Sequence, residues 1–491
     1  MTYVNSVNAE GAPRYYGRPL PTPSRFQLAQ RGWRIARAFV PRVGPVALRQ
    51  LRTASKGPLD AALFAKPLRE SFEKVGGTFV KFGQIIASSP GLFGEELANE
   101  FRSCLDTGPV VAIEQVRAIV EEELGRSIEE VFATFDPTPI GRASIAVVHR
   151  ATLHDGTEVA VKVLRPGIDQ LVATDLDLMQ PMFDILVKQT GAQLAGATLQ
   201  QLDGLRVQIG EELDLRNEAR ALVHFRHLTD ESELDLIAVP RPYPEFSGRN
   251  VLTMEFLDGV AIDDLSKVEA LGLDPAPVLE QLIRGFFTMT VRWGTFHGDV
   301  HAGNLLMLRD GRIGVIDWGI VGRLDAATHR FFTKMLSAVL GDESAWREVT
   351  DFIIGNYGTA IREAMGMDDE QLAQFMRMMI EPILLRPFGE VSFAEMMNMT
   401  QVQVAQANGV EWQHQSWRQL FQRIRMQRKL HRMAVAGGGL MTEFDRGNFL
   451  LGKQLMYFER YGRLYLADRA ILSDRPFLEK LLADYATDES A

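Results

Sequence analysis

The spacing of apolar residues predicts a long helix after Ser71. Five apolar residues recur there at steps of three and four, which places them on one side of the helix: Phe72, Val75, Phe79, Phe82 and Ile86. Lys81, Gln84 and Ser88 recur at the same steps on the opposite side, a pattern that by itself is typical of a solvent-exposed face. Two more helices are predicted, one over 94–110 that ends at Gly108-Pro109 and one over 112–125 that Gly125 ends.

The pattern changes to that of β-strands between residues 136 and 167, with a hairpin turn at Asp155-Gly156. In the strand 158–164, Val159, Val161 and Val163 face one way, while Ala160, Lys162 and Leu164 face the other. Lys162 has two interpretations. It is an edge-strand lysine that reaches water, or it is a phosphate-pairing lysine like that of the kinase VAIK strand.

The segment 205–228 predicts a single helix that is rich in carboxylates. At about 100° per residue, Asp214 and Glu218 share a face and Glu212 lies roughly 120° from Glu218. Such a helix is either a solvated, salt-bridged helix or the kinase helix that pairs an acid with the strand lysine. The segment 250–264 predicts a strand followed by a polar connection that contains glycine, as a hinge between two lobes requires.

The segment 294–319, GTFHGDVHAGNLLMLRDGRIGVIDWG, combines two aspartates and an asparagine with a hairpin that turns at Asp310-Gly311. Phosphoryl transfer needs a carboxylate near the acceptor hydroxyl and oxygen ligands for Mg²⁺. We therefore predict that Asp299 is catalytic and that Asn304 and Asp317 bind the metal. Together with Lys162 and the acidic helix, this array predicts a kinase-like architecture.

Two histidines in the same segment, His297 and His301, have the spacing of metal ligands on a helix. Because they lie in a loop, we expect them to support that loop rather than to bind zinc.

Composition narrows the function classes. The chain has 491 residues, 46% hydrophobic and 24% charged, which is ordinary globular composition. A net charge of −10 disfavours nucleic acid as a partner, and the single cysteine, Cys104, excludes a disulfide framework and a thiolate zinc site. No apolar run is long enough to span a membrane and no secretory signal is evident. We therefore expect a cytoplasmic protein, with peripheral attachment to an inner membrane left open.

The first 60 residues depart from this acidic balance, since they carry ten Lys and Arg residues but only Glu10 and Asp60 as acids. Their mixture of arginines with Phe26, Trp33 and Phe39 suits an anionic membrane surface. It also suits an organelle transit peptide, or a solvated arm that packs on the rest of the protein.

The chain is predicted to be helical from about Asp342 onward, as in the segments 368–385 and 416–433, with Gly437-Gly438-Gly439 between two helices. Methionines are frequent in this region. They are interpreted as adaptable core, with a lipid-facing groove as the alternative: Met376, Met378, Met379, Met396, Met397 and Met399. The end of the chain, LLADYATDESA, is too polar to insert into a membrane.

Residues 71–340 resemble the UbiB (AarF) family of atypical kinase-like proteins. KFGQIIAS at 81–88 is similar to the family's KxGQ motif, and SIAVVHRA at 144–151 is similar to its Ala-rich phosphate-covering loop. ELD at 212–214 matches its ExD motif, and FHGDVHAGNLL and IDWG match its catalytic and metal-binding loops. The resemblance implies that the KxGQ helix covers the active site where a protein substrate would bind. Lys81 and Gln84 would then face the nucleotide, with Glu212 facing Lys81 and Glu218 facing Lys162.

This resemblance and the motifs together give a full set of expected site residues. The catalytic set is Asp299, Lys162, Lys81 and Glu212. The nucleotide-binding set is Lys81, Gln84, Ala143, Ser144, Ile145, Ala160, Lys162, Glu218, Glu255, Phe256, Asn304 and Asp317. The expected cofactors are ATP and Mg²⁺.

Three departures qualify the resemblance. Gly141 and Arg142 stand where the family has alanines, and Arg142 is expected to add a charge beside the phosphates. The HGD sequence also occurs in aminoglycoside and choline phosphotransferases, although these lack a KxGQ helix before the small lobe. No APE segment follows Gly319, which weighs against an ordinary protein kinase.

The expected fold is α+β, a two-lobed protein-kinase-like fold with helical extensions at both ends. The expected divisions are a basic arm (1–70), a KxGQ extension (71–135), a small lobe (136–257), a catalytic core of the large lobe (258–340) and a C-terminal extension (341–491). The expected function is an ATP-binding, Mg²⁺-dependent atypical kinase or ATPase that supports isoprenoid-quinone or related lipid biosynthesis. The alternatives are a small-molecule phosphotransferase and a non-catalytic nucleotide-gated scaffold for lipid enzymes.

Expected partners are a nucleotide and no nucleic acid, with a membrane surface, an isoprenoid lipid, lipid-biosynthetic enzymes and a second copy of the chain left open. One observation decides the family-specific interpretation, namely whether the helix that bears Lys81 contacts the pocket between Lys162 and Asp317.

Overall fold

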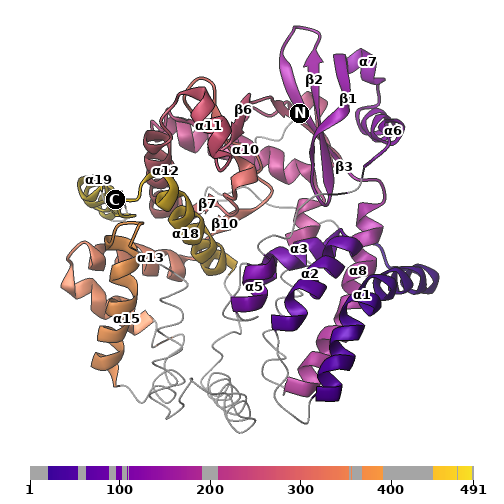
Figure 1. Cartoon of the computed structure of the whole chain (residues 1–491). Helices are drawn as coiled ribbons and strands as arrows, with labels where there is room; N and C mark the ends of the chain where they lie inside the picture. The colour runs from indigo at the N-terminus through magenta and orange to yellow at the C-terminus, as the bar shows by residue number, and fades with distance from the viewer. Residues whose placement is uncertain are drawn as a thin grey trace.

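The computed structural model describes residues 20–53, 62–87, 95–101, 108, 110–190, 208–352, 355, 368–390, 446–472 and 474–488. A small lobe built on a sheet lies beside a mostly helical large lobe, and helices from both ends of the chain pack around this core (Figure 1). The expected two-lobed kinase-like fold with terminal helical extensions is confirmed.

The small lobe is an antiparallel sheet in the order β1-β2-β3-β5. Its strands are β1 (Phe132–Arg142), β2 (Ala146–Leu153), β3 (Glu158–Leu164) and β5 (Val251–Glu255), and the β2–β3 hairpin turns at Gly156 with φ 87°. The three valines of β3 pack beneath α6 (Ile113–Leu124) and α7 (Ile128–Val131), whereas Ala160 and Leu164 join the core on the opposite face. The predicted alternation along β3 is thus confirmed.

Lys162 lies on an interior strand, because β3 is bonded to β2 on one side and to β5 on the other. Its Cα partners are Val148 and Leu252. The edge-strand interpretation of this lysine is therefore wrong, since both edges of β3 are occupied.

The acidic segment is a helical turn followed by a separate helix, not the single helix predicted over 205–228. Residues 208–212 are helical, and α10 (Leu215–Glu231) begins after Asp214, whose φ of −128° is not helical. The Asp214 carboxylate accepts a hydrogen bond from the backbone N–H of Arg216 and so caps α10. Asp214 consequently does not share a helix face with Glu218.

The large lobe surrounds a buried helix, α12 (Ala276–Trp293), and two small sheets. One sheet has the order β4-β9-β8-β6 and the other pairs β7 with β10. Their bounds are β4 (Ile237–Ala238), β6 (Gly259–Ala261), β7 (Thr295–His297), β8 (Leu305–Leu308), β9 (Ile313–Val315) and β10 (Val321–Arg323). The predicted hairpin at Asp310-Gly311 joins β8 to β9, with Gly311 at φ 88°. The remaining elements of this lobe are α11 (Leu265–Leu271), α13 (Ala326–Val339) and the 3-10 turn Ala302–Asn304, whereas the 3-10 turn Pro244–Phe246 packs on β5 of the small lobe.

The N-terminal extension consists of α1 (Arg25–Thr53), α2 (Ala62–Val75), α3 (Thr78–Ala87) and α5 (Glu95–Phe101). The long helix predicted after Ser71 is wrong in one respect, because it breaks at Gly76 and Gly77, whose φ values are 69° and 59°. Its apolar stripe is confirmed, since Phe72, Phe79, Phe82 and Ile86 are all buried. Only the first part of the predicted helix 94–110 lies within the described residues.

A buried ion pair fastens this extension to the core. Arg31 of α1 donates two hydrogen bonds to Asp175 of α8 (Ile168–Thr190), at 2.6 and 3.0 Å. Asp175 also accepts a hydrogen bond from the backbone of Thr78, the first residue of α3. One carboxylate thus ties α1 and α3 to α8, and α3 carries Lys81.

The described part of the C-terminal extension comprises α15 (Asp369–Leu385), α18 (Arg446–Tyr465) and α19 (Arg475–Asp488). The predicted helix over 368–385 is confirmed as α15. The segment 416–433, the triple glycine and Met396, Met397 and Met399 lie outside the described residues, as do the side chains of Met376 and Met379. Met378 is half-exposed.

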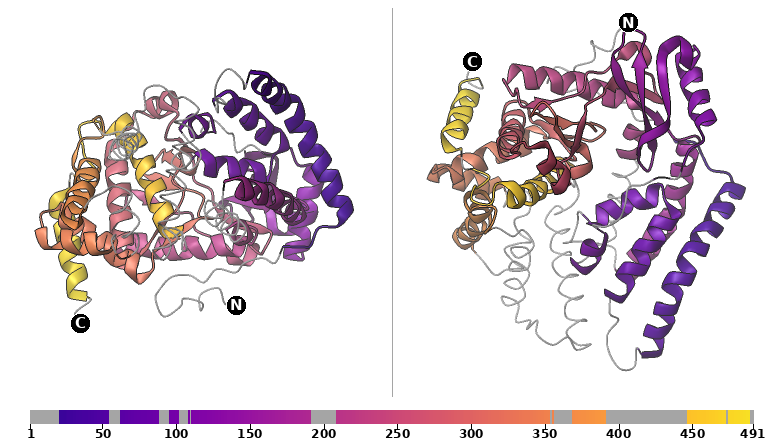
Figure 2. Two further views of the ribbon diagram at one scale, coloured as in Figure 1. Left: turned by 90° about the horizontal axis from the view of Figure 1, so that it is seen from below. Right: turned by 45° about the horizontal axis from the view of Figure 1, so that its top comes forward.

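The two extensions pack on different parts of the core (Figure 2). The N-terminal helices lie along α8, below the small-lobe sheet, whereas α18 lies against α12 and β10 of the large lobe. Among the described helices, none is both long enough and apolar enough to cross a membrane.

Candidate active site

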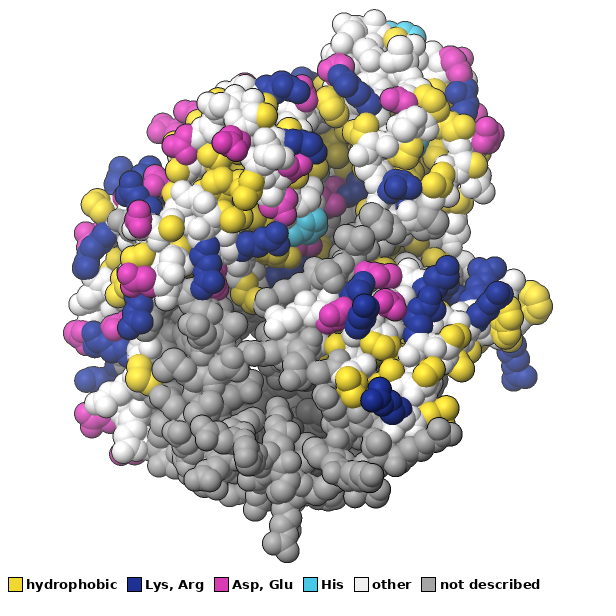
Figure 3. Space-filling view, viewed as in Figure 1, with side chains coloured by type: hydrophobic (Ala, Val, Ile, Leu, Met, Phe, Trp, Pro, Cys, Tyr) yellow, Lys and Arg dark blue, Asp and Glu magenta, His cyan; other side chains and the backbone are white. Residues whose placement is uncertain are grey.

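A pocket between the lobes collects most of the predicted site residues. Its walls come from α3, the β1–β2 loop, β3, the start of α10 and the segment after β9, and charged side chains gather in the hollow between the lobes (Figure 3). The lining includes Lys81, Ala143, Ser144, Ile145, Lys162, Glu212, Glu218 and Asp317. The helix that bears Lys81 therefore does contact the pocket between Lys162 and Asp317, as the family-specific interpretation required.

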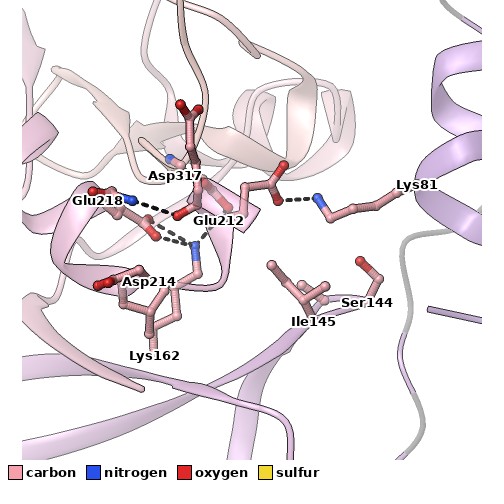
Figure 4. Close-up of a pocket in the computed structure, with 13 residues that line it drawn as sticks. Lys81, Ser144, Ile145, Lys162, Glu212, Asp214, Glu218 and Asp317 are labelled. Atoms are coloured by element: carbon pink, nitrogen blue, oxygen red, sulfur yellow. Dashed lines mark hydrogen bonds and ion pairs between the residues drawn. The ribbon is translucent and has the colours of Figure 1, made fainter. Parts of the chain in front are cut away.

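Lys162 lies between two carboxylates (Figure 4). Its Nζ donates to both Glu218 oxygens, at 2.9 and 2.8 Å, and to Asp317 Oδ2 at 3.1 Å. Burial acts to lower the pKa of Lys162, but the charges of Asp317 and Glu218 outweigh it and hold the pKa above its ordinary value. Burial raises the pKa of Glu218 to about 7, although Lys162 acts in the opposite direction. Lys162 thus remains a cation next to whatever binds in the pocket.

Asp317 is fixed by the residues that follow it. Its Oδ1 accepts a hydrogen bond from the Gly319 N–H at 3.0 Å. Trp318 is buried, donates from Nε1 to the Val315 carbonyl at 2.8 Å, and packs on Phe225 of α10 with 4.3 Å between ring centroids. Burial acts to raise the pKa of Asp317, but Lys162 and the Gly319 N–H bring it well below its usual range. An ionised carboxylate is therefore held at the pocket wall.

Lys81 reaches the pocket from the N-terminal extension and forms an ion pair with Glu212 (Figure 4). Their side chains are 13% and 7% exposed, so neither faces bulk water. The expected pairing of Glu212 with Lys81 and of Glu218 with Lys162 is observed, although the break at Asp214, and not one continuous helix, sets the two directions. The side chain of Gln84 lies outside the described residues.

The ion pairs draw the pocket walls together. The pocket encloses about 440 Å³ when space open to solvent is counted.

The loop between β1 and β2 is held in place by Arg165. This side chain donates from Nε to the Ala143 carbonyl at 2.9 Å, and its backbone N–H donates to the Ile145 carbonyl at 2.9 Å. Ser144 and Ile145 are buried against the pocket. The expectation for Arg142 is wrong, since its side chain is exposed and does not line the pocket.

His297 and His301 hold the catalytic loop, as expected. His297 Nδ1 accepts from the Asp299 N–H at 3.0 Å, which leaves Nε2 to donate to the Asp317 carbonyl at 2.5 Å. Burial lowers the pKa of His297 to about 4, so this neutral form persists at physiological pH. His301 Nδ1 accepts from the Gly303 N–H at 3.0 Å. The described residues contain no group of three or more His, Cys, Asp or Glu side chains that could hold a metal.

Asn304 and Asp317 nevertheless fit Mg²⁺ in the way that nucleotide enzymes bind it. Mg²⁺ in such sites takes one or two protein ligands and completes its shell with phosphate oxygens and water. The Asn304 side-chain amide donates to the Asp299 carbonyl at 2.9 Å, so its oxygen remains as an acceptor. Asp317 supplies an ionised carboxylate. Asn304 itself does not line the pocket.

Besides Asn304, four predicted residues are not part of the pocket lining. Ala160 is buried in the core on the same face of β3 as Lys162, and Phe256 packs under Arg150 at 4.5 Å. Glu255 accepts a hydrogen bond from the Arg241 N–H at 3.1 Å. Asp299 lies beyond the pocket lining, where Lys453 Nζ approaches its Oδ1 at 2.8 Å.

Lys453 and its neighbour Tyr457 on α18 were not predicted from the sequence. Both contact Asp299, although about 150 positions separate them from it in the chain. A signal was present in the recurrence of Lys453, Tyr457, Tyr461 and Tyr465 at steps of four, which places them along one helix face. Nothing in that pattern pointed to Asp299.

Comparison with known proteins places this geometry in a family. The family model of the ABC1 atypical kinase-like domain matches residues 103–350. An uncharacterized protein of Mycobacterium tuberculosis is 33% identical over 476 residues, which cover 96% of this chain and 87% of the relative. An uncharacterized aarF domain-containing protein kinase of Arabidopsis thaliana, described as chloroplastic, is 35% identical over 83% of this chain and 73% of its own.

A probable protein kinase UbiB of Marinobacter nauticus is 33% identical over 66% of this chain and 59% of its own length. A solved structure of Rv3197 of Mycobacterium tuberculosis with erythromycin is 22% identical, covers 79% of this chain and 93% of its own, and has a TM-score of 0.43. A likeness of that size carries no argument about function.

Proposed function

Because the chain belongs to the ABC1 atypical kinase-like family, which includes the proteins named UbiB, we propose that it binds ATP with Mg²⁺ and transfers the γ-phosphoryl group to water or a small acceptor. We propose further that this activity supports the synthesis of isoprenoid quinones or related lipids. The functional divisions are taken to be the arm 1–70, the KxGQ extension 71–135, the small lobe 136–257, the catalytic core 258–340 and the C-terminal extension 341–491.

The observation that carries the proposal is the meeting of Lys81 and Lys162 in one pocket with Asp317. Two ammonium groups face the space where phosphates would lie, and an ionised carboxylate lies beside them. Such an arrangement suits a polyanion with a bound divalent cation, since each cation offsets phosphate charge in a site shielded from water. Bound Mg²⁺ would neutralise charge on the phosphates, with Asn304 and Asp317 as its protein ligands.

The place of α3 favours a small acceptor over a protein. Phe72, Phe79 and Phe82 anchor this part of the extension in the core. Lys81 projects from it to the pocket, so α3 lies across the entrance that a peptide would need. In the part of the chain that the structure describes, α13 begins directly after the Asp325 cap and leaves little room for an activation segment.

The test is nucleotide binding and turnover by the full chain and by Asp317→Asn. A ligand at 100 times its Kd stabilises a fold by about 2.7 kcal/mol, so Mg-ATP should raise the Tm of the parent clearly and that of Asp317→Asn little. Multiple-turnover phosphate release, with and without added lipid or phenolic compounds, then measures catalysis. Equal Tm shifts in both proteins would contradict the assignment of Asp317. Binding without turnover would favour the nucleotide-gated scaffold, and label transfer to an aminoglycoside would favour the small-molecule phosphotransferase.

The basic helix α1 supports a proposed contact with an anionic membrane surface. Phe26, Trp33 and Val40 are 76%, 61% and 64% exposed and recur every seven residues, so they form one apolar stripe. Arg25, Arg34 and Arg37 are exposed on the same helix, and dark blue and yellow side chains lie together on the N-terminal helices in Figure 3. This combination is typical of helices that lie in a lipid interface. Co-sedimentation with phosphatidylglycerol vesicles but not with phosphatidylcholine vesicles is the expected result, and equal binding to both would contradict it.

A further inference from the structure

The helix α18 contacts the catalytic loop through one continuous stripe of side chains. Lys453 pairs with Asp299 Oδ1 at 2.8 Å, and the Tyr457 hydroxyl also bonds the Asp299 carboxylate. One turn further, the Tyr461 hydroxyl donates to the Val300 carbonyl at 2.8 Å, and the Tyr465 hydroxyl donates to the Ile262 carbonyl at 2.6 Å. Since these residues are four apart, one face of α18 lies along the loop.

The two ends of this stripe do different things. Tyr461 and Tyr465 bond backbone carbonyls, which fastens α18 to the large lobe without touching a reactive group. Lys453 forms an ion pair with the side chain of Asp299, the residue assigned to the nucleophile's proton, and the Tyr457 hydroxyl contacts the same carboxylate. If anchoring were the only task of α18, a contact with this carboxylate would be unnecessary.

The catalytic loop provides no permanent cation of its own. Between Asp299 and Asn304 it reads Val-His-Ala-Gly, without lysine or arginine. The backbone of Asp299 is held by His297 and Asn304, whereas within the described part of the chain its carboxylate is held by Lys453 and Tyr457. The side chains of Lys453 and Asp299 are 13% and 18% exposed, so the pair is shielded from water and its orientation is restricted.

We propose that Lys453 is a positioning residue of the active site, which holds the Asp299 carboxylate in the orientation that accepts the proton of the attacking nucleophile. This inference rests on the proposed function. In the step concerned, the nucleophile's oxygen forms a bond to the γ-phosphorus and its proton passes to Asp299. The bond from the γ-phosphorus to the bridging oxygen breaks, and its electron pair remains on ADP. Lys453 keeps its own protons throughout, and α18 is thereby a part of the catalytic site.

The inference differs from a structural role in what it predicts for kinetics. A residue that only fastens α18 affects folding, and its loss lowers the fraction of active protein. A residue that orients Asp299 affects the rate of the chemical step and leaves nucleotide affinity unchanged, because Asp299 does not line the pocket where the phosphates of the nucleotide would lie. Arginine keeps a donor in the same place, whereas methionine keeps only the length of the side chain.

The experiment compares the full-length parent, Lys453→Met and Lys453→Arg. Arg460→Met is the matched control, since Arg460 lies on the same helix and pairs at 3.0 Å with Asp263 at the surface. Measured quantities are the Kd for Mg-ATP, kcat, KM and the amide hydrogen exchange of residues 299–304. A positioned general base contributes about 10²–10⁴-fold to a rate, so Lys453→Met should lower kcat by about 10–100-fold, with Kd and KM within about twofold of the parent. Exchange of the loop amides should rise, and Lys453→Arg should recover most of kcat.

A second comparison asks whether Lys453 acts through Asp299. In an Asp299→Asn background, Lys453→Met should cause no further loss of kcat, because the group that it positions is already gone. A kcat for Lys453→Met within twofold of the parent, or above it, would overturn the inference, as would an equal loss in Arg460→Met. If the parent itself binds Mg-ATP but neither releases phosphate nor transfers label to an added small acceptor, the proposed catalytic function fails. A parent that turns over normally while Lys453→Met matches it overturns only the role of Lys453.

Discussion

The N-terminal and C-terminal extensions each bring one lysine to a carboxylate of the kinase-like core. Lys81 of α3 pairs with Glu212 at the pocket between the lobes, and Lys453 of α18 pairs with Asp299 beyond it. Both pairs are largely shielded from water, although the segments that supply the lysines lie at opposite ends of the chain. Residues from both extensions thus reach carboxylates of the core, on two sides of it.

The two extensions are fastened by different physical means. A cluster of aromatic rings anchors the N-terminal one, with Phe72 at 5.5 Å from Phe79 and 5.0 Å from Phe101, and the buried Arg31–Asp175 pair adds to it. The C-terminal helix is fastened by tyrosine hydroxyls that donate to backbone carbonyls. Loss of a buried charge partner costs more than loss of a single neutral hydrogen bond. Mutations of the N-terminal anchor should therefore destabilise the fold more than mutations of the C-terminal anchor.

The largest effect is expected for Arg31→Met. Asp175 is fully buried, and removal of Arg31 leaves its charge uncompensated, which costs about 3–5 kcal/mol. Burial already raises the pKa of Asp175 above its unfolded value despite Arg31. For an acid whose pKa is higher in the folded than in the unfolded state, stability falls as pH rises from the unfolded pKa to the folded pKa. Arg31→Met widens this pH range, because Arg31 no longer lowers the folded pKa of Asp175. The destabilisation should therefore be largest near pH 7 and should shrink as pH falls towards 4, as measured by urea unfolding.

The exposed Arg34 provides the control for this prediction, since Arg34→Met on the same helix should change stability by no more than about 0.5 kcal/mol. The double variant Arg31→Met, Asp175→Leu should recover much of the loss, because no buried charge remains. A pH-independent loss, or an equal loss in Arg34→Met, would show that the ion pair does not anchor α1.

A smaller effect is expected at the break between α2 and α3. Gly76 and Gly77 both have positive φ, which costs a residue with a Cβ roughly 1–2 kcal/mol. A Cβ at Gly76 would meet open space, whereas one at Gly77 would approach Leu171 Cδ2 at 3.1 Å. Thermal unfolding of the two alanine variants should show Gly77→Ala as the less stable. If both variants were as stable as the parent, the break between α2 and α3 would not depend on the positive φ of these glycines.

The smallest effect is expected at the C-terminal anchor. Tyr461→Phe removes the hydrogen bond to the Val300 carbonyl and should cost about 1 kcal/mol. Tyr465→Phe is the matched variant and should cost less, since Tyr465 is only partly buried and water can replace its hydroxyl. Urea unfolding measures both. A Tyr461→Phe loss as large as that of Arg31→Met would remove the contrast between the two extensions.

The parts of the site that follow one another in the chain could be predicted from the sequence. Asp299 and Asn304 precede the β8–β9 hairpin and Asp317 follows it, while Lys162 follows the alternation of a single strand, so local pattern was enough to propose these residues for the site. The role of Lys81 needed the resemblance to a family, because a polar stripe on a helix is ordinarily solvated. Here the helix packs with its apolar stripe in the core and its lysine directed to the pocket.

Other features depended on tertiary context. The break at Asp214 arises because its carboxylate caps α10 and also pairs with Arg249, some 35 positions away in the chain. The break before α3 occurs at two adjacent glycines, Gly76 and Gly77. The apolar residues keep their helical spacing across these glycines, so the pattern gave no sign of the break. Lys453 could not be matched to Asp299, because no local pattern records which helix face meets which loop.

The most direct test of the account is the affinity of the parent and of Lys81→Ala for Mg-ATP and Mg-ADP. Hydrogen bonds to charged groups contribute about 1.5–3 kcal/mol, so loss of Lys81 beside the phosphates should weaken Mg-ATP binding by about tenfold and Mg-ADP binding less. Glu212→Ala should also alter the ratio of Mg-ATP affinity to Mg-ADP affinity. Lys74→Ala should leave this ratio unchanged, because Lys74 is exposed on α2. If Lys81→Ala and Glu212→Ala both match the parent for both nucleotides, Lys81 does not serve the nucleotide, and the N-terminal extension is only packed against the site.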